Sequence, residues 1–116
     1  MSGLTEPVGV ATNTHQWDQD LIFMALSDPV RRKLLLALAR GGPKPAIELN
    51  EGVSRAPDTT LKHLANLRAA GLVTMNPNPK DGRRALYALS PSVQVIMTPE
   101  GRVVDFGFCT LRLDLF

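Results

Sequence analysis

One stretch of the sequence, from Pro57 to Leu89, restricts the possible folds more than any other. Apolar residues recur at helical spacing from Pro57 to Ala70, and Gly71 stands where a helix that ends in a left-handed residue needs a glycine. Leu72 to Met75 is typical of a β-strand, and a turn rich in Pro, Asn and Gly separates it from a return strand, Ala85 to Leu89. The stretch therefore predicts a helix that runs directly into a β-hairpin.

Three further helices are predicted before it, over His15 to Leu26, Pro29 to about Arg40, and Ala46 to Asn50. Asp28 before Pro29 is a helix-start signal, because the carboxylate caps free amides and proline fits the first turn. The expected inward residues are Trp17, Leu21, Met24 and Ala25 in the first helix, Leu34, Leu35, Leu38 and Ala39 in the second, and Ile47 in the third.

The two ends of the chain have other patterns. Residues 1–14 show neither helical nor strand periodicity, which predicts a flexible tail. In residues 91–116, Val93 to Met97 is β-rich, a turn follows, and Val103 to Leu113 alternates over a long run with Phe106 and Phe108 on one face. This region predicts a C-terminal β-hairpin, which could close the monomer or serve as a dimerisation element.

The helix from Pro57 to Ala70 carries two stripes. The stripe expected to pack inward is Leu61, Leu64, Leu67 and Arg68, and the polar stripe is Thr59, Lys62, His63 and Asn66. Asparagine binds adenine bidentately, and lysine and histidine reach guanine acceptors or phosphate oxygens. Any amphipathic helix has a polar face, so this stripe alone favours no partner.

The predicted hairpin tip, residues 76–84, is basic. Lys80, Arg83 and Arg84 surround an Asp-Gly turn, which suits contact with phosphates or entry into the minor groove. Arg55, just before the helix, is a further candidate for phosphate contact. Because a polar helix and a basic hairpin adjoin through Gly71, the combination predicts binding of double-stranded DNA.

Composition narrows the other possibilities. The 116 residues carry a formal net charge of +2 and a single cysteine, so an intrachain disulfide is impossible. No stretch approaches the roughly 20 apolar residues needed to span a bilayer, and no apolar signal core is seen at the N-terminus, so a cytoplasmic protein is expected. Nucleophile, phosphate-loop and metal-ligand motifs are not recognisable, and we expect neither an enzyme nor a cofactor or metal.

At the level of combined motifs the chain resembles the ArsR-type winged helix-turn-helix regulators. The resemblance rests on residues 25–35 (ALSDPVRRKLL), 59–64 (TTLKHL), 67–73 (LRAAGLV) and 82–89 (GRRALYAL). It implies a mainly α fold with a β-hairpin wing over residues 15–90, and a homodimer that represses transcription from a palindromic operator until an unidentified signal releases it. Residues 47–50 lack the family's Cys-x-Cys metal ligands, and its C-terminal helix is replaced by predicted strands, so metal sensing is not expected.

The expected dimer interface combines the first helix, through Trp17, Leu21 and Met24, with Phe106 and Phe108 of the terminal hairpin. An alternative function is a winged-helix module for protein–protein interaction or assembly, since the fold alone does not select DNA. DNA binding and protein–protein interaction differ in how affinity depends on salt, because phosphate contacts weaken steeply as salt is added.

Overall fold

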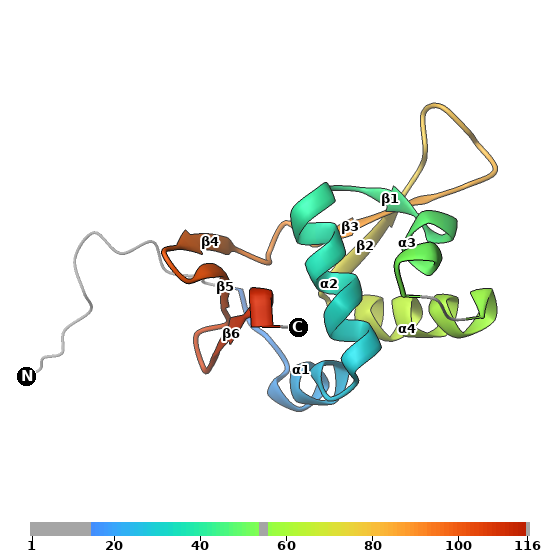
Figure 1. Ribbon diagram of the computed structural model, residues 1–116. Coiled ribbons are helices and arrows are strands. Elements are labelled where there is room, and N and C mark those ends of the chain that lie inside the picture. Colours follow the sequence, from blue (N-terminus) through green and yellow to red (C-terminus); the bar gives the residue numbers. More distant parts are fainter. Residues whose placement is uncertain (1–14, 54–55, 116) are drawn as a thin grey trace, which may run out of the picture.

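The computed structural model describes residues 15–53 and 56–115, which form four α-helices and two small antiparallel sheets (Figure 1). The predicted tail, residues 1–14, and Arg55 lie outside the described residues. The element order α1-α2-β1-α3-α4-β2-β3 confirms the predicted mainly α fold with a β-hairpin wing. Three more strands follow, β4, β5 and β6.

The first two helices begin at aspartates. In α1 (Gln19–Leu26) the Asp18 carboxylate accepts from the amide of Leu21 at 3.1 Å. The Asp28 carboxylate accepts from Val30 N at 2.7 Å and starts α2 (Pro29–Gly41), as predicted from the Asp-Pro signal. The predicted start of α1 at His15 is wrong, because Asp18 is the cap and Trp17 therefore precedes the helix. The prediction of Leu21 and Met24 as inward residues is also wrong, because they are 40% and 62% exposed, whereas Ile22 and Ala25 are buried.

A short strand, β1 (Lys44–Pro45), leads into α3 (Ala46–Val53), and α4 spans Pro57–Ala69. The prediction that α3 ends near Asn50 is wrong, because the helix continues through Gly52. The prediction of Ile47 as its inward anchor is also wrong. Ile47 is 49% exposed, whereas Leu49, two positions on and on the opposite side of the helix, is 2% exposed and belongs to the core.

The end of α4 fixes where the wing starts. Gly71 has φ +82°, the amide of Leu72 donates to Leu67 O at 2.9 Å, and the amide of Gly71 donates to Arg68 O at 3.0 Å. This pair of bonds is the Schellman arrangement, which needs a left-handed residue at Gly71. The chain leaves it as β2 (Val73–Asn76), which pairs with β3 (Leu86–Leu89), while β1 pairs with the other edge of β3.

The C-terminal region forms a three-stranded sheet in the order β4-β5-β6: Val95–Thr98, Gly101–Asp105 and Thr110–Arg112. The prediction of one long strand from Val103 to Leu113 is wrong, because the chain reverses at Gly107 (φ +90°). The Asp105 carboxylate accepts from the amide of Gly107 at 2.8 Å, and the amide of Phe106 donates to Cys109 O at 2.8 Å, closing the turn. The alternating pattern belongs to two strands that fold back on each other.

This sheet lies on the opposite side of α2 from the wing (Figure 1). Its buried residues Val104 and Phe106 join the same hydrophobic cluster as the helices, together with Leu113 of the short 3-10 helix η1 (Leu113–Leu115). A single core therefore runs through both parts.

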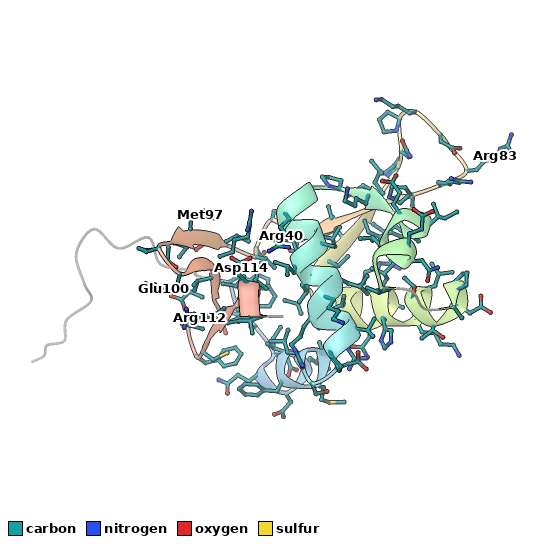
Figure 2. All side chains as sticks on the ribbon, viewed as in Figure 1. Arg40, Arg83, Met97, Glu100, Arg112 and Asp114 are labelled. Carbon is teal, nitrogen blue, oxygen red and sulfur yellow. The ribbon has the colours of Figure 1, made fainter. Side chains whose placement is uncertain are left out.

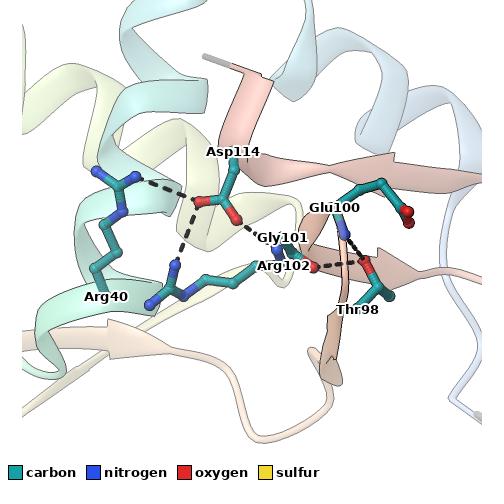
Figure 3. Close-up of polar contacts among 6 residues, drawn as sticks. All are labelled: Arg40, Thr98, Glu100, Gly101, Arg102 and Asp114. Atoms are coloured by element: carbon teal, nitrogen blue, oxygen red, sulfur yellow. Dashed lines mark hydrogen bonds and ion pairs between the residues drawn. The ribbon is translucent and has the colours of Figure 1, made fainter.

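A polar contact reinforces that junction (Figure 3). The Asp114 carboxylate accepts from the backbone amide of Arg102 and from its guanidinium at 3.3 Å, and it meets the guanidinium of Arg40, on α2, at 3.4 Å. The amide and guanidinium of Arg102, followed by Arg40, hold the pKa of Asp114 below its usual value despite partial desolvation. The last turn of the described chain is thus tied to β5 and to α2.

Candidate nucleic-acid interface

The outer face of α4 is polar and small. Thr59, Lys62 and Asn66 are all exposed and lie within about 60° of one another around the helix axis, at 100° per residue. Ala65 and Ala69 are exposed beside them. These alanines carry no polar signal in the sequence, yet their small side chains let a helix approach a groove closely. Asp58 is the acidic residue of the helix and lies in its first turn.

The buried face of α4 differs from the predicted stripe, because Leu61 and Arg68 are exposed and Thr60 is buried instead. Leu64 and Leu67 are fully buried, but Leu61 is 45% exposed and Thr60 is 0% exposed. The Thr60 hydroxyl donates to Asn50 Oδ1 of α3 at 2.5 Å. A buried hydroxyl needs a partner, and this bond joins the two helices of the helix-turn-helix at their corner. A threonine in phase with Leu64 and Leu67 was the available signal.

His63 lies at the edge of the polar face rather than on it. Its ring is half-buried, and Nδ1 is 3.3 Å from a guanidinium nitrogen of Arg31. Asp28, which starts α2, lies near both His63 and Arg31. Desolvation acts to raise the pKa of Asp28, but the amides of Arg31 and Val30, with His63 and Arg31 beside them, bring it below its ordinary value.

The wing is the loop between Asn76 and Leu86, the last pair of the β2–β3 ladder. It projects from the body, and Arg83 points away from it near the tip (Figure 2). The Asn78 and Asp81 side chains accept from the amides of Lys80 and Arg83 at 2.9 and 3.0 Å, so the tip is a pair of local turns. Lys80, Arg83 and Arg84 are all exposed, and Arg84 is 3.8 Å from Asp81.

Between the wing and the helices lies a hollow of about 290 Å³. Ile47 of α3, Leu61 of α4 and Tyr87 of β3 provide apolar walls, and Arg83 and Arg84 also line it. The exposure of Ile47 and Leu61 on the side that bears the wing was not foreseen, because both were assigned to the core. The hollow gives α3, α4 and the wing one shared surface.

The residues predicted for a dimer interface separate into two groups. Trp17 is half-buried and packs edge-on against Phe106, which is 4% exposed and belongs to the core, with ring centroids 5.3 Å apart. Leu21 and Met24 are 40% and 62% exposed on α1. On the same helix Phe23, which was not among the predicted interface residues, is 53% exposed and meets Phe108 edge-on, with ring centroids 5.4 Å apart. Leu21, Phe23, Met24 and Phe108 are called the α1 apolar surface below.

The one cysteine, Cys109, is half-buried and free. Burial, followed by the Asp105 carboxylate, raises the pKa of the Cys109 thiol, which disfavours the reactive thiolate. Across residues 15–53 and 56–115, no three His, Cys, Asp or Glu side chains gather in a way that could hold a metal ion. Within that same part of the chain, each helix is too short or too polar to cross a membrane.

Comparison with known proteins agrees with this geometry. Residues 26–76 match the family model described as helix-turn-helix domain. No curated protein sequence matches the chain. Among solved structures, a probable transcriptional regulator from Pseudomonas aeruginosa is 28% identical, with TM-score 0.54, over 63% of this chain and 58% of its own. An ArsR family transcriptional regulator is 33% identical, with TM-score 0.54, over 62% of this chain and 70% of its own.

A third similar structure is that of a MarR mutant from E. coli, described as complexed with operator DNA. It is 25% identical, with TM-score 0.54, over 62% of this chain and 54% of its own. The chain thus spans less than two thirds of the first of these relatives and of MarR.

The fold, the helix-turn-helix match and these neighbours together define a class. The chain belongs to the winged helix-turn-helix transcriptional regulators. Within that class α3 and α4 are the helix-turn-helix and the β2–β3 loop is the wing, as the chain order and the Gly71 junction require.

Proposed function

We propose that this protein is an ArsR-type repressor that binds a palindromic operator as a homodimer. The observation that carries the proposal is the exposed polar row Thr59, Lys62 and Asn66 on α4. The same helix borders the basic wing, because its Leu61 lines one hollow with Arg83 and Arg84. A major groove admits an α-helix, and these side chains match base edges and phosphate oxygens. The MarR structure with operator DNA supports the same use of this fold.

The contacts divide into two kinds. Lys62 and Asn66 project from the middle of the outer face of α4 and are proposed to read base edges, with Thr59 beside them. Lys80, Arg83 and Arg84 are proposed to hold phosphates from the wing. The side chain of Arg84 is 57% exposed despite its neighbour Asp81, so its guanidinium remains accessible to a phosphate.

The α1 apolar surface is proposed as the homodimer interface. Leu21, Phe23 and Met24 expose a run of large apolar side chains on one short helix, and Phe108 continues it from the C-terminal sheet. Exposed apolar patches of this kind mark interaction sites. Because an operator with two-fold symmetry requires two reading helices one helical turn of DNA apart, a dimer is the form expected to bind it.

The proposed function is binding and not catalysis. The proposed location is the cytoplasm, where a regulator of bacterial type meets its DNA. The alternative, a winged helix used for protein–protein interaction, is favoured by the apolar hollow with Ile47 and Leu61 beside the wing. The basic wing favours DNA over it.

The test is selection of duplexes from a random library by the full chain, followed by affinity measurements with the double variant Lys62→Ala/Asn66→Ala. Sequence-specific binding should be lost in that variant while its circular dichroism spectrum and melting temperature stay those of the wild type. The matched control, Lys33→Ala/Gln94→Ala, removes one cation and one amide from exposed positions off α4 and should bind normally. Unchanged affinity of Lys62→Ala/Asn66→Ala would overturn the proposal.

A further inference from the structure

The two nitrogens of the His63 ring have different surroundings. Nδ1 is 3.3 Å from NH1 of Arg31. The same guanidinium is held from its other side, because its Nε donates to Ala25 O at 2.7 Å and its NH2 donates to Met24 O at 2.9 Å. These carbonyls belong to the last turn of α1, and Met24 O also accepts from the amide and the hydroxyl of Ser27, at 3.3 and 2.6 Å. Arg31 therefore keeps its position for reasons unconnected with His63.

This contact determines where the imidazole carries its proton. An arginine guanidinium is always protonated and only donates hydrogen bonds. The Nδ1 atom of His63 must then be the acceptor, which places the hydrogen of the neutral ring on Nε2. In a doubly protonated ring Nδ1 would carry a hydrogen, and two N–H donors would then face each other. The nearby Asp28 carboxylate is occupied in capping α2, through the amides of Val30 and Arg31.

The Nε2 atom is open. Within the described residues it makes no hydrogen bond, and it is not among the buried polar atoms that lack a partner. His63 is one turn after Thr59 and three residues before Asn66, on the side of α4 that faces α1 and α2. His63 therefore lies at the edge of the outer face of α4, where the DNA backbone rather than a base edge would meet its ring.

We propose that Arg31 fixes His63 as the Nε2–H tautomer and so presents an outward N–H that donates to a DNA phosphate oxygen. The phosphate part rests on the proposed function, and the tautomer part does not. Arg31 is a positioning residue in this scheme, and His63 is the contact. A donor-only nitrogen suits a phosphate, whose oxygens only accept, and such a contact orients the helix without reading sequence.

The tautomer is tested on the full chain without DNA. Long-range ¹H–¹⁵N correlation spectra at about pH 8, where an ordinary imidazole is neutral, distinguish a nitrogen that carries hydrogen from one that does not. His63 should show a bare Nδ1 and a protonated Nε2, and His15→Gln assigns the signals. Averaged tautomers or an Nδ1–H at His63 would overturn the proposal. Arg31→Lys keeps the positive charge but lacks the planar guanidinium that reaches Ala25 O, Met24 O and His63 Nδ1 together, so the fixed tautomer should be lost.

The phosphate contact is tested with two substitutions of different reach. The amide nitrogen of glutamine extends about as far as Nε2, whereas that of asparagine reaches only the Nδ1 position. His63→Gln should keep duplex affinity within about threefold, and His63→Asn should lose on the order of tenfold, by a similar factor on every duplex. Equal affinities of the two variants, or a loss confined to one base sequence, would refute the phosphate contact. If the wild type binds no duplex, the proposed function fails, and the tautomer still stands or falls on the spectra.

Discussion

Replacing Thr60 by valine tests how the helix-turn-helix corner is held. Valine has nearly the shape of threonine but lacks the hydroxyl, so Thr60→Val removes the 2.5 Å bond to Asn50 Oδ1 and little else. A neutral hydrogen bond contributes about 1 kcal/mol net, and an orphaned buried acceptor raises the cost toward 3 kcal/mol. Because Asn50 is only half-buried, water reaches its carbonyl. We therefore expect a loss of about 1–2 kcal/mol.

Urea denaturation followed by circular dichroism measures this loss, and the melting temperature should fall by about 4 °C per kcal/mol. Thr60→Ser is the matched control, since it keeps the hydroxyl and removes one methyl group. A double-mutant cycle that combines Thr60→Val with Asn50→Ala should give a coupling energy of about 1 kcal/mol between the two side chains. A variant Thr60→Val as stable as the wild type, or zero coupling, would refute the idea that this bond holds α3 against α4.

Three further predictions concern the ends of the helices and the wing. Gly71→Ala should cost about 1–2 kcal/mol in thermal unfolding because of its left-handed φ, while Gly82→Ala, at an open position without that φ, should be nearly neutral. Asp28→Ala should lose a helix cap worth about 1 kcal/mol. The pKa of Asp28 is lower in the folded protein than in the unfolded chain, so its ionised carboxylate stabilises the fold. This contribution is complete at pH values above the unfolded pKa and is lost as pH falls through the folded pKa. The stability of Asp28→Asn should therefore depend less steeply on pH in that range. Arg83→Gln should lower the salt slope of duplex binding by about one, whereas Arg112→Gln, on the far sheet, should leave it unchanged.

Much of the fold follows from local chemistry that the sequence displays. The Asp28-Pro29 start of α2 and the Gly71 end of α4 each depend on a few adjacent residues, and both were predicted correctly. The start of α1 was missed because Trp17 has helical spacing to the residues after it. Asp18 competes as a cap, and Trp17 instead packs on Phe106, a contact that spacing along the chain does not reveal.

The errors in the candidate site have a common cause. Apolar spacing identified a buried face for α4 but assigned Leu61 to it, because a buried threonine is explained only by its partner on another helix. The same holds for Ile47, whose exposure depends on the hollow beside the wing, and for His63, whose ring is placed by Arg31. Contacts between helices decide these positions, and periodicity within one helix does not.

The C-terminal sheet shows how far alternation can mislead. Val103 to Leu113 alternates well enough for one strand, and a chain reversal at Gly107 preserves the alternation on both sides of the turn. A glycine within an alternating run was the signal for a bend.

The most direct measurement of the central claim is a ¹H–¹⁵N correlation map of the full chain titrated with a selected operator duplex. If α4 and the wing form the reading surface, the largest amide shifts should fall in residues 58–69 and 78–84, with little change in β4, β5 and β6. Shifts centred on the C-terminal sheet or on α1, with α4 and the wing unmoved, would contradict it.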